Sequence, residues 1–495
     1  MTHSDAHDPH PSSTELAYLG VNELHDRLES GELSSRHLVQ TLIARIAALD
    51  VGTSEVALRS IAAVADDAIE VATERDAERV LGRSRGPLHG IPVVIKDNIE
   101  ANGLPGYAGS TSLVGRPPRE APLVARLRDA GAIVMASTNL SEWANMRSPH
   151  STSGWSATGG LVGNPWALDR SAGGSSSGSG AALAAGLAPL AIGTETDGSI
   201  VCPASLNGVV GLKATIDAIP RDYIVPISAS QDAPGPMGRT VQDVAVLFGV
   251  LSGQDMVNFR DKEVRFGVAT TWRTGHDATD KLFDEFVPRL QASNEVVVSV
   301  APVNAGEQEH QDEFEVLLDE LHDDLTTYLT KRPGGGVSSL ADVIAFEVDN
   351  AATELRYFGH EFFDMSLARG GRSNETYRAT RERSLAWATS TCLEPALEGL
   401  DVLIAPSYAP AWKSDLSLSG HQAAKSSGVT MAAAIAGWPI ANVPLGLVDG
   451  LPVGIAIVGR AHSDWLVLAA AHKIESVINA WQPIGRATFR APQRG

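Results

Sequence analysis

The chain has 495 residues, with 59 acidic against 39 basic side chains and a formal net charge of −20. This balance is unlike the basic surface of a nucleic-acid-binding protein and excludes most functions of that class. Hydrophobic residues make up 43% and charged residues 20%, which is typical of a soluble globular protein with a large core. The two cysteines, Cys202 and Cys392, do not make a disulfide framework, and we expect both to be buried thiols.

The N-terminal sequence lacks the basic and apolar segments of a secretory signal, and no uninterrupted apolar run of about 18 residues predicts a membrane span. We therefore expect a cytoplasmic protein that binds neither a membrane nor nucleic acid, present as a monomer or a homodimer. Residues 1–15 are polar and are predicted to form a disordered tail. No linker divides the rest, so residues 16–490 are predicted to form a single domain.

The predicted elements change character along the chain. The first 80 residues are predicted to be helical, because apolar side chains such as Leu38, Leu42 and Ile46 recur at helical spacing. A strand within residues 87–98, a helix over 122–130 and a strand over 132–135 follow. This alternation indicates an α/β fold, a sheet covered by helices.

The second half begins with an acidic stretch. Residues 261–350 hold 19 acidic and 7 basic side chains, and apolar residues keep helical spacing from Phe314 until Pro333. We interpret residues 255–400 as a variable helical layer at the surface. A strand is then predicted over residues 402–405. Two apolar runs, at 443–448 and 453–458, flank Asp449-Gly450 and predict a β-hairpin. A final helix is predicted to begin near Asp464.

Several short motifs give only weak signals. Ser176 stands at the centre of a G-x-S-x-G pattern, but the residues before it resemble a loop rather than the strand that a nucleophile elbow requires. His3, His7 and His10 lie in the polar terminus, where a disordered tail is favoured over a metal site. No H-E-x-x-H or C-x-x-C motif exists to support a zinc site, and Gly178-Ser-Gly180 lacks the third glycine and the preceding strand of a dinucleotide-binding loop. We therefore expect neither a metal nor an organic cofactor.

Lys96 is a stronger signal. It is the only lysine among the first 212 residues, and it follows the apolar run Ile91-Pro-Val-Val-Ile, which predicts a buried strand. Burial disfavours the charged form of a lysine and lowers its pKa toward neutrality, which is what a lysine needs in order to act as a base. A lysine that simply ends a strand is the ordinary alternative for this residue alone.

Two serine-containing segments accompany this lysine. A glycine-serine loop surrounds Ser175, and Ser199 follows a polar, glycine-containing turn whose backbone N–H groups could converge on an anion. Each segment alone fits a flexible linker or a simple turn. The combination of all three predicts Ser-Ser-Lys catalysis, in which lysine rather than histidine supplies the base.

The same segments resemble the amidase signature family, and the likeness extends from about residue 20 to about residue 490. The family's fold implies a central mixed, twisted β-sheet covered on both faces by helices, with the signature core at about residues 81–215. Among its branches the chain is most similar to peptide amidase. The segments that carry the resemblance are Gly90 to Asn98, Ser137 to Glu142, Gly173 to Ser179 and Gly193 to Ala204.

The resemblance implies a role for each matching residue. Ser199 would be the nucleophile, Ser175 a bridging serine that follows a cis peptide bond, and Lys96 the base. The backbone N–H groups of Thr196, Asp197, Gly198 and Ser199 would form the oxyanion hole. Four further residues are expected to bind substrate: Trp143, Asn145, Trp155 and Gly174.

These roles imply hydrolysis of a linear amide through an acyl-enzyme, with the C-terminal amide of a peptide or a related small amide as substrate. The same scaffold also serves aryl acylamide and carbamate hydrolases, so these substrates stay open. So do two further functions, that of a transamidation subunit that needs a partner chain and that of a non-catalytic binding protein. The substrate pocket is expected between residues 143–155 and 310–420.

Overall fold

The computed structural model describes residues 13–52, 56–115, 118–293, 295–417, 424–482 and 485–491. The disordered tail was predicted for residues 1–15, of which residues 1–12 lie outside the described residues. The prediction is wrong for residues 13–15, because Ser13–Leu16 form the short helix α1. Within these ranges no helix combines the length and the apolar character needed to cross a membrane. Both cysteines are free and buried, as predicted.

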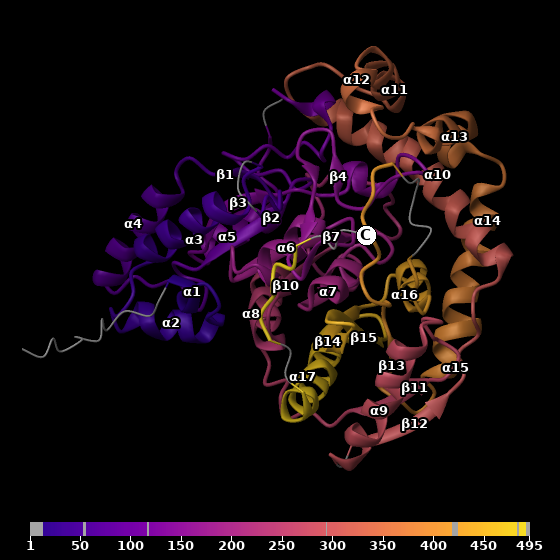
Figure 1. Ribbon diagram of the computed structural model, residues 1–495. Coiled ribbons are helices and arrows are strands. Elements are labelled where there is room, and N and C mark those ends of the chain that lie inside the picture. The colour runs from indigo at the N-terminus through magenta and orange to yellow at the C-terminus, as the bar shows by residue number, and fades with distance from the viewer. Residues whose placement is uncertain are drawn as a thin grey trace, which may run out of the picture.

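A mixed sheet runs through the molecule (Figure 1). The strands, in spatial order, are β1 (Ile61–Val64), β3 (Ile133–Thr138), β2 (Pro92–Lys96), β8 (Leu190–Glu195), β10 (Ala233–Gly238), β9 (Val210–Lys213), β14 (Ile440–Val448), β15 (Leu451–Gly459), β13 (Val402–Pro406), β11 (Arg265–Ala269) and β12 (Val296–Val300). Strands β3, β2 and β8 are parallel to one another, and so are β13, β11 and β12. The remaining neighbours, the edge strand β1 among them, pair antiparallel.

Helices cover both faces of this sheet, which confirms the predicted α/β architecture. Helices α6 (Ser177–Ala184) and α7 (Val201–Asn207) contact each other and the strands beneath them. A second contiguous group contacts the sheet elsewhere and comprises α5 (Pro122–Asp129), α8 (Val241–Ser252), α9 (Asp277–Ala292) and α17 (Asp464–Trp481). Helices α2 (Val21–Glu29), α3 (Ser35–Leu49) and α4 (Ala68–Val80) precede the core strands.

An outer helical layer lies along one side of the molecule, drawn in orange in Figure 1. Its longest member is α10 (Glu307–Lys331), which contacts the two helices α13 (Glu361–Arg369) and α14 (Tyr377–Ala386). Helix α10 confirms the helix predicted from the apolar spacing that ends before Pro333. The other helical segments here are α11 (Leu340–Asp349), α12 (Ala351–Glu354), a π-helical turn (Trp387–Leu393) and α15 (Glu394–Ala396). Helix α16 (Val429–Ala436) is buried and contacts α14 and the π-helical turn.

The structure has strands in two stretches that were predicted to be helical, residues 1–80 and 255–400, so both predictions are wrong in part. Strand β1 lies within the first 80 residues, where the sequence Ile61-Ala-Ala-Val64 gives no strand signal of its own and pairing with β3 decides the conformation. Strands β11 and β12 lie within residues 255–400 and extend the sheet at its far edge. The predicted strand at 402–405, the hairpin and the final helix are confirmed as β13, β14–β15 and α17.

Candidate active site

Lys96 is the last residue of β2, and its position follows from the strand register. β2 and β8 are parallel neighbours, with Ile95 beside Ile192, so both strands end at the same edge of the sheet. The Lys96 amine reaches across this edge and donates hydrogen bonds to Ser175 Oγ at 2.7 Å, to Thr194 Oγ1 at 2.8 Å and to the Thr194 carbonyl at 3.1 Å. The side chain has no exposed surface.

Burial dominates the ionisation of this lysine. Removal from water disfavours the ammonium form and lowers the pKa of Lys96 from 10.5 to about 7, although the carboxyl groups of Asp232 and Glu195 act in the opposite direction. The amine is therefore neutral in a large share of molecules near pH 7. A neutral amine beside a serine hydroxyl is able to take its proton.

Ser175 follows Gly174 across a cis peptide bond and directly precedes the segment that enters α6. Its backbone carbonyl accepts a hydrogen bond from the Ser141 N–H at 3.1 Å. Gly174 has no room for a side chain, because a Cβ would lie 2.3 Å from Ser141 Oγ and 2.9 Å from Ser153 Oγ. Glycine at 174 is thus a packing requirement of the loop that holds Ser175.

Ser199 lies on the turn between β8 and α7. Its backbone carbonyl accepts the Ser176 N–H at 3.1 Å, which fixes the two serine segments side by side. The side chain of Glu195 accepts the N–H groups of Ile200 and Val201 at 2.6 and 2.9 Å, so the first turn of α7 is held against the end of β8. Ser199 is 9% exposed and lines a cavity.

The turn before Ser199 is shaped by side chains from other elements. Gly198 has a φ of 75°, and a Cβ there would lie 2.6 Å from Tyr408 Oη. The Thr196 hydroxyl donates to Asp232 Oδ1 at 2.6 Å. Asp197 lines the cavity and is exposed there. The protein around its carboxyl group replaces water and so raises its pKa, although a hydrogen bond with Thr430 acts in the opposite direction.

The front cavity, as we call the hollow beside Ser199, has a volume of about 440 Å³. The turn of residues 196–199 and Gly174 form one part of its wall, and Asn145 another. Asn145 donates to Ser153 Oγ at 3.3 Å, while its Oδ1 is buried without a hydrogen-bond partner among the described residues. The apolar and aromatic side chains of the wall come from Met146, Pro149, Ile227, Leu317, Phe362, Tyr408 and Trp412.

The two tryptophans expected to bind substrate do not line this cavity in the described part of the chain. Trp143 is 4% exposed and packs edge-on against Phe363 of α13, with ring centroids 5.8 Å apart. Trp155 packs against Tyr357 and Phe358 at 5.4 and 5.0 Å. Both indoles pack between the core and the outer helical layer.

A group of three buried acidic side chains is a candidate for metal binding. Glu142, Glu347 and Glu354 each place a carboxylate oxygen within 4.8 Å of the others. The fully buried guanidinium of Arg147 pairs with Glu142 and lies 4.0 Å from Glu354, while His360 pairs with Glu347 at 2.8 Å. Arg147 and His360 thus already occupy positions beside these carboxyl groups, and burial raises the pKa of Glu142 well above its usual value, which weakens the case for a metal here.

Three residues around the site were not singled out from the sequence. Thr194 contacts the Lys96 amine, Asn98 donates to Thr194 Oγ1 at 3.0 Å, and Asp232 holds the Thr196 hydroxyl. Asn98 and Thr194 lie within two residues of predicted site residues and inside the segments that carry the family resemblance, which are the signals that could have found them. Asp232 comes from a loop more than 30 positions away, and no local pattern connects it to the turn.

The arrangement thus brings together five predicted features: a buried lysine, its serine partner, a second serine at a cavity, a turn of backbone N–H groups and an asparagine. A weakly basic amine next to one hydroxyl, with a second hydroxyl exposed to a cavity, is a constellation suited to nucleophilic attack on a carbonyl group.

Comparisons with known proteins identify amidases among the relatives of this chain. The peptide amidase of Stenotrophomonas maltophilia superposes with a TM-score of 0.87 at 40% identity, over 95% of this chain and 99% of that one. A complex of peptide amidase with the competitive inhibitor chymostatin gives a TM-score of 0.88 at 40% identity, over 93% and 98% of the two chains. A glutamyl-tRNA(Gln) amidotransferase subunit from Symbiobacterium thermophilum is 32% identical over 90% of this chain and 94% of its own length.

A family model shows how far the likeness extends. The amidase family model matches residues 37–468, which include the ends of β2 and β8, both serine segments and the whole outer helical layer. The chain therefore belongs to the amidase signature family and is an amide-hydrolysing enzyme.

Proposed function

We propose that this enzyme removes the amide nitrogen from the C-terminal carboxamide of a peptide, or from a related small linear amide, through an acyl-enzyme on Ser199. The hydrogen bond between the Lys96 amine and Ser175 Oγ carries the proposal. This hydrogen bond is 2.7 Å long, and neither side chain has exposed surface. It connects Lys96, whose pKa is lowered to about 7, with the serine segment that lies against Ser199.

The proposed reaction begins with neutral Lys96. Its amine accepts the Ser175 proton while Ser175 takes the proton of Ser199, and Ser199 Oγ attacks the amide carbonyl carbon. Backbone N–H groups of residues 196–199 stabilise the oxyanion, each donor by about 3 to 4 kcal/mol in comparable hydrolases. Ser175 then protonates the leaving nitrogen, and water repeats the attack to release the acid.

Two features of the front cavity support a primary amide as substrate. Asn145 Oδ1, which is buried and lacks a partner among the described residues, is an acceptor suited to a carboxamide N–H. The apolar walls at Met146, Leu317 and Phe362 suit the side chain of the amidated residue. The 40% identity with peptide amidases of known structure supports the same substrate class.

A substrate panel tests this proposal. Purified enzyme is assayed on a peptide amide, the matching free peptide, an anilide and a carbamate, with Ser199→Ala as the control. We expect ammonia release from the peptide amide and none from the control. Preference for the anilide or the carbamate would instead favour an aryl acylamide or carbamate hydrolase, and absence of both turnover and fluorophosphonate labelling would favour a binding protein.

A matched pair of substrates tests the contact of Asn145. The peptide methyl ester has the acyl group of the amide but no N–H for Asn145 Oδ1 to accept. Asn145→Ala should therefore raise KM for the amide by about tenfold, a loss of about 1.4 kcal/mol, and leave KM for the ester near that of the unchanged enzyme. Equal effects on both substrates would contradict this role.

A further inference from the structure

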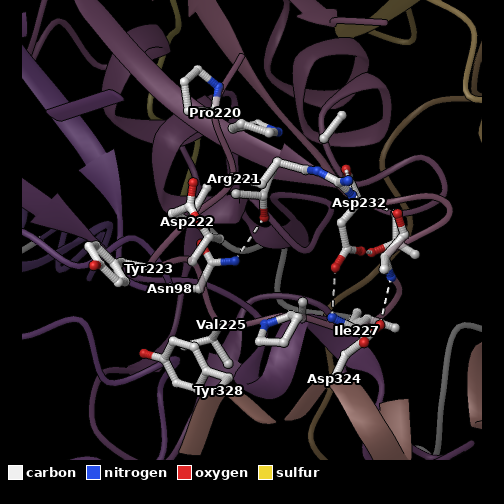
Figure 2. Close-up of a pocket in the computed structure, with 18 of the residues that line it drawn as sticks. Asn98, Pro220, Arg221, Asp222, Tyr223, Val225, Ile227, Asp232, Asp324 and Tyr328 are labelled. Carbon is white, nitrogen blue, oxygen red and sulfur yellow. Dashed lines mark hydrogen bonds between the residues drawn. The ribbon is translucent and has the colours of Figure 1, made fainter. Parts of the chain in front are cut away.

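A second cavity of about 430 Å³ lies on the other side of the turn at Thr196, and we call it the rear cavity. The loop of residues 217–234 and helix α10 form most of its wall (Figure 2). Ala144, Thr196 and Ile227 line both this cavity and the front cavity. These three side chains are thus the partition between the two, and the cavities are direct neighbours.

The rear cavity reaches the proton-relay side of the site, whereas the front cavity reaches the nucleophile. Thr194, whose hydroxyl and carbonyl both accept from the Lys96 amine, lines the rear cavity. Ser199 and Gly174 line the front cavity. Ser175 lines neither cavity, but it is hydrogen-bonded to Lys96, and Lys96 to Thr194, so only the Lys96 amine separates Ser175 from a residue of the rear wall.

One buried polar atom in this wall indicates a small hydrogen-bonding ligand. Asn98 is 3% exposed and lines the rear cavity, and its Nδ2 donates to Thr194 Oγ1 at 3.0 Å. Its Oδ1 has no hydrogen-bond partner among the described residues. A buried acceptor without a partner costs about 1 to 3 kcal/mol, and a water or ammonia molecule in the cavity would supply the missing donor.

A carboxyl group also lines the rear cavity. Figure 2 shows Asp232 among the side chains around the cavity, and this half-buried residue accepts the Thr196 hydroxyl as well as the N–H groups of Ile227 and Ser228. The rim is formed by exposed residues, among them Ala229 of the loop and Thr327 of α10. Polar atoms thus line a way from the exposed rim to the neighbours of Lys96.

From these observations we propose that the rear cavity is the port through which water enters for deacylation and ammonia leaves after acylation. The inference rests on the proposed function. Acylation breaks the amide C–N bond, forms the ester bond to Ser199 and moves the Ser199 proton through Ser175 to nitrogen. Deacylation breaks that ester with one water and returns a proton to Ser199. During both steps the acyl group occupies the front cavity.

Two variants that narrow the rim test the port. Thr327→Trp places a large side chain at the rim from α10, and Ala229→Trp does so from the loop opposite. Thr330→Trp is the matched control, since Thr330 is exposed on the same helix and does not line the rear cavity. Thermal melting checks that all three fold.

The probes are N-acetylphenylalanine p-nitrophenyl ester and N-acetylphenylalanine amide. The ester acylates rapidly, so its burst reports acylation and its steady rate reports deacylation. In both rim variants we expect an unchanged burst and a steady rate about tenfold lower, with amide turnover reduced as well, while Thr330→Trp behaves as the unchanged enzyme.

The outcomes separate the two proposals. A steady ester rate equal to that of the unchanged enzyme in both rim variants, or loss of the burst itself, overturns the port. If the unchanged enzyme hydrolyses the ester but releases ammonia from no carboxamide, the proposed function is wrong, and the ester rates of the variants still decide whether water enters from the rear.

Discussion

Replacement of Lys96 tests the proposed base, and the structure sets the size of the effect. Burial lowers the pKa of this lysine from 10.5 to about 7. At pH 7 a lysine with the ordinary value is neutral in about one molecule in three thousand, whereas one with a pKa of about 7 is neutral in about half. The site therefore raises the fraction of neutral base by about a thousandfold.

The sign of the pH dependence follows from the neutral amine. Because only the neutral form accepts a proton, kcat/KM for a peptide amide is expected to rise about tenfold per pH unit below pH 7 and to level off above it. Stability changes in the same direction. The folded state binds fewer protons at Lys96 than the unfolded state between about pH 7 and pH 10.5, so the free energy of unfolding rises with pH across that window.

Lys96→Met keeps the length of the side chain and removes the basic nitrogen. Loss of a general base predicts a fall in kcat/KM of about a hundredfold to ten-thousandfold, measured as ammonia release from about pH 5 to about pH 9. Lys213→Met is the matched control, because Lys213 is also fully buried but donates to the carbonyls of Ala433 and Trp438. A flat profile, or a Lys96→Met rate within about tenfold of the unchanged enzyme, would refute the reasoning.

Three further substitutions probe the surroundings of the site. Gly174→Ala brings a Cβ to 2.3 Å from Ser141 Oγ; thermal and urea melts are expected to show a loss of about 1 to 3 kcal/mol, with slower fluorophosphonate labelling. Asp232→Asn removes a negative charge that raises the pKa of Lys96, so the acid limb of kcat/KM should move to lower pH. Arg147→Met leaves its buried acidic partner without a cation, which urea denaturation should register as a loss of about 3 to 5 kcal/mol.

Each of these has a control within the chain. Gly485→Ala adds a Cβ into open space and should change neither stability nor labelling. Asp222→Asn alters an exposed carboxyl on the same loop as Asp232 and should leave the acid limb in place. Adding Glu142→Gln to Arg147→Met should recover part of the lost stability, since it also neutralises the partner. A double variant as unstable as the sum of the two single ones would contradict the pairing argument.

The elements predicted correctly are those whose signal lies within a short stretch of chain. The hairpin of β14 and β15 follows from two apolar runs around Asp449-Gly450, and α10 follows from apolar spacing that ends before Pro333. Strand β1 could not be predicted in this way. Its two alanines favour a helix, and only its pairing with β3, about 70 residues later, makes it a strand.

The site itself was predictable to the extent that its residues stand in recognisable segments. Lys96 was singled out by its place at the end of an apolar run, yet Lys213 also ends a buried strand and has no exposed surface. What separates the two lysines is the partners: Lys96 donates to the hydroxyls of Ser175 and Thr194 as well as to a carbonyl, whereas Lys213 donates to backbone carbonyls. Such partners are set by tertiary contacts that no single segment encodes, which is also why Asp232 was missed.

Helix α10 borders both cavities, and this has a mechanical consequence. Leu317 lies at the front cavity and Tyr328 at the rear one, eleven residues or about 16 Å along the same rigid axis. A helix of this length moves as a rod, so any slide or tilt that widens one cavity is transmitted to the other. Substitutions that reshape α10 at the front cavity to accept a bulkier substrate are thus expected to change the shape of the rear cavity as well. The range of substrates that the enzyme accepts then depends on the contacts that hold α10 in place.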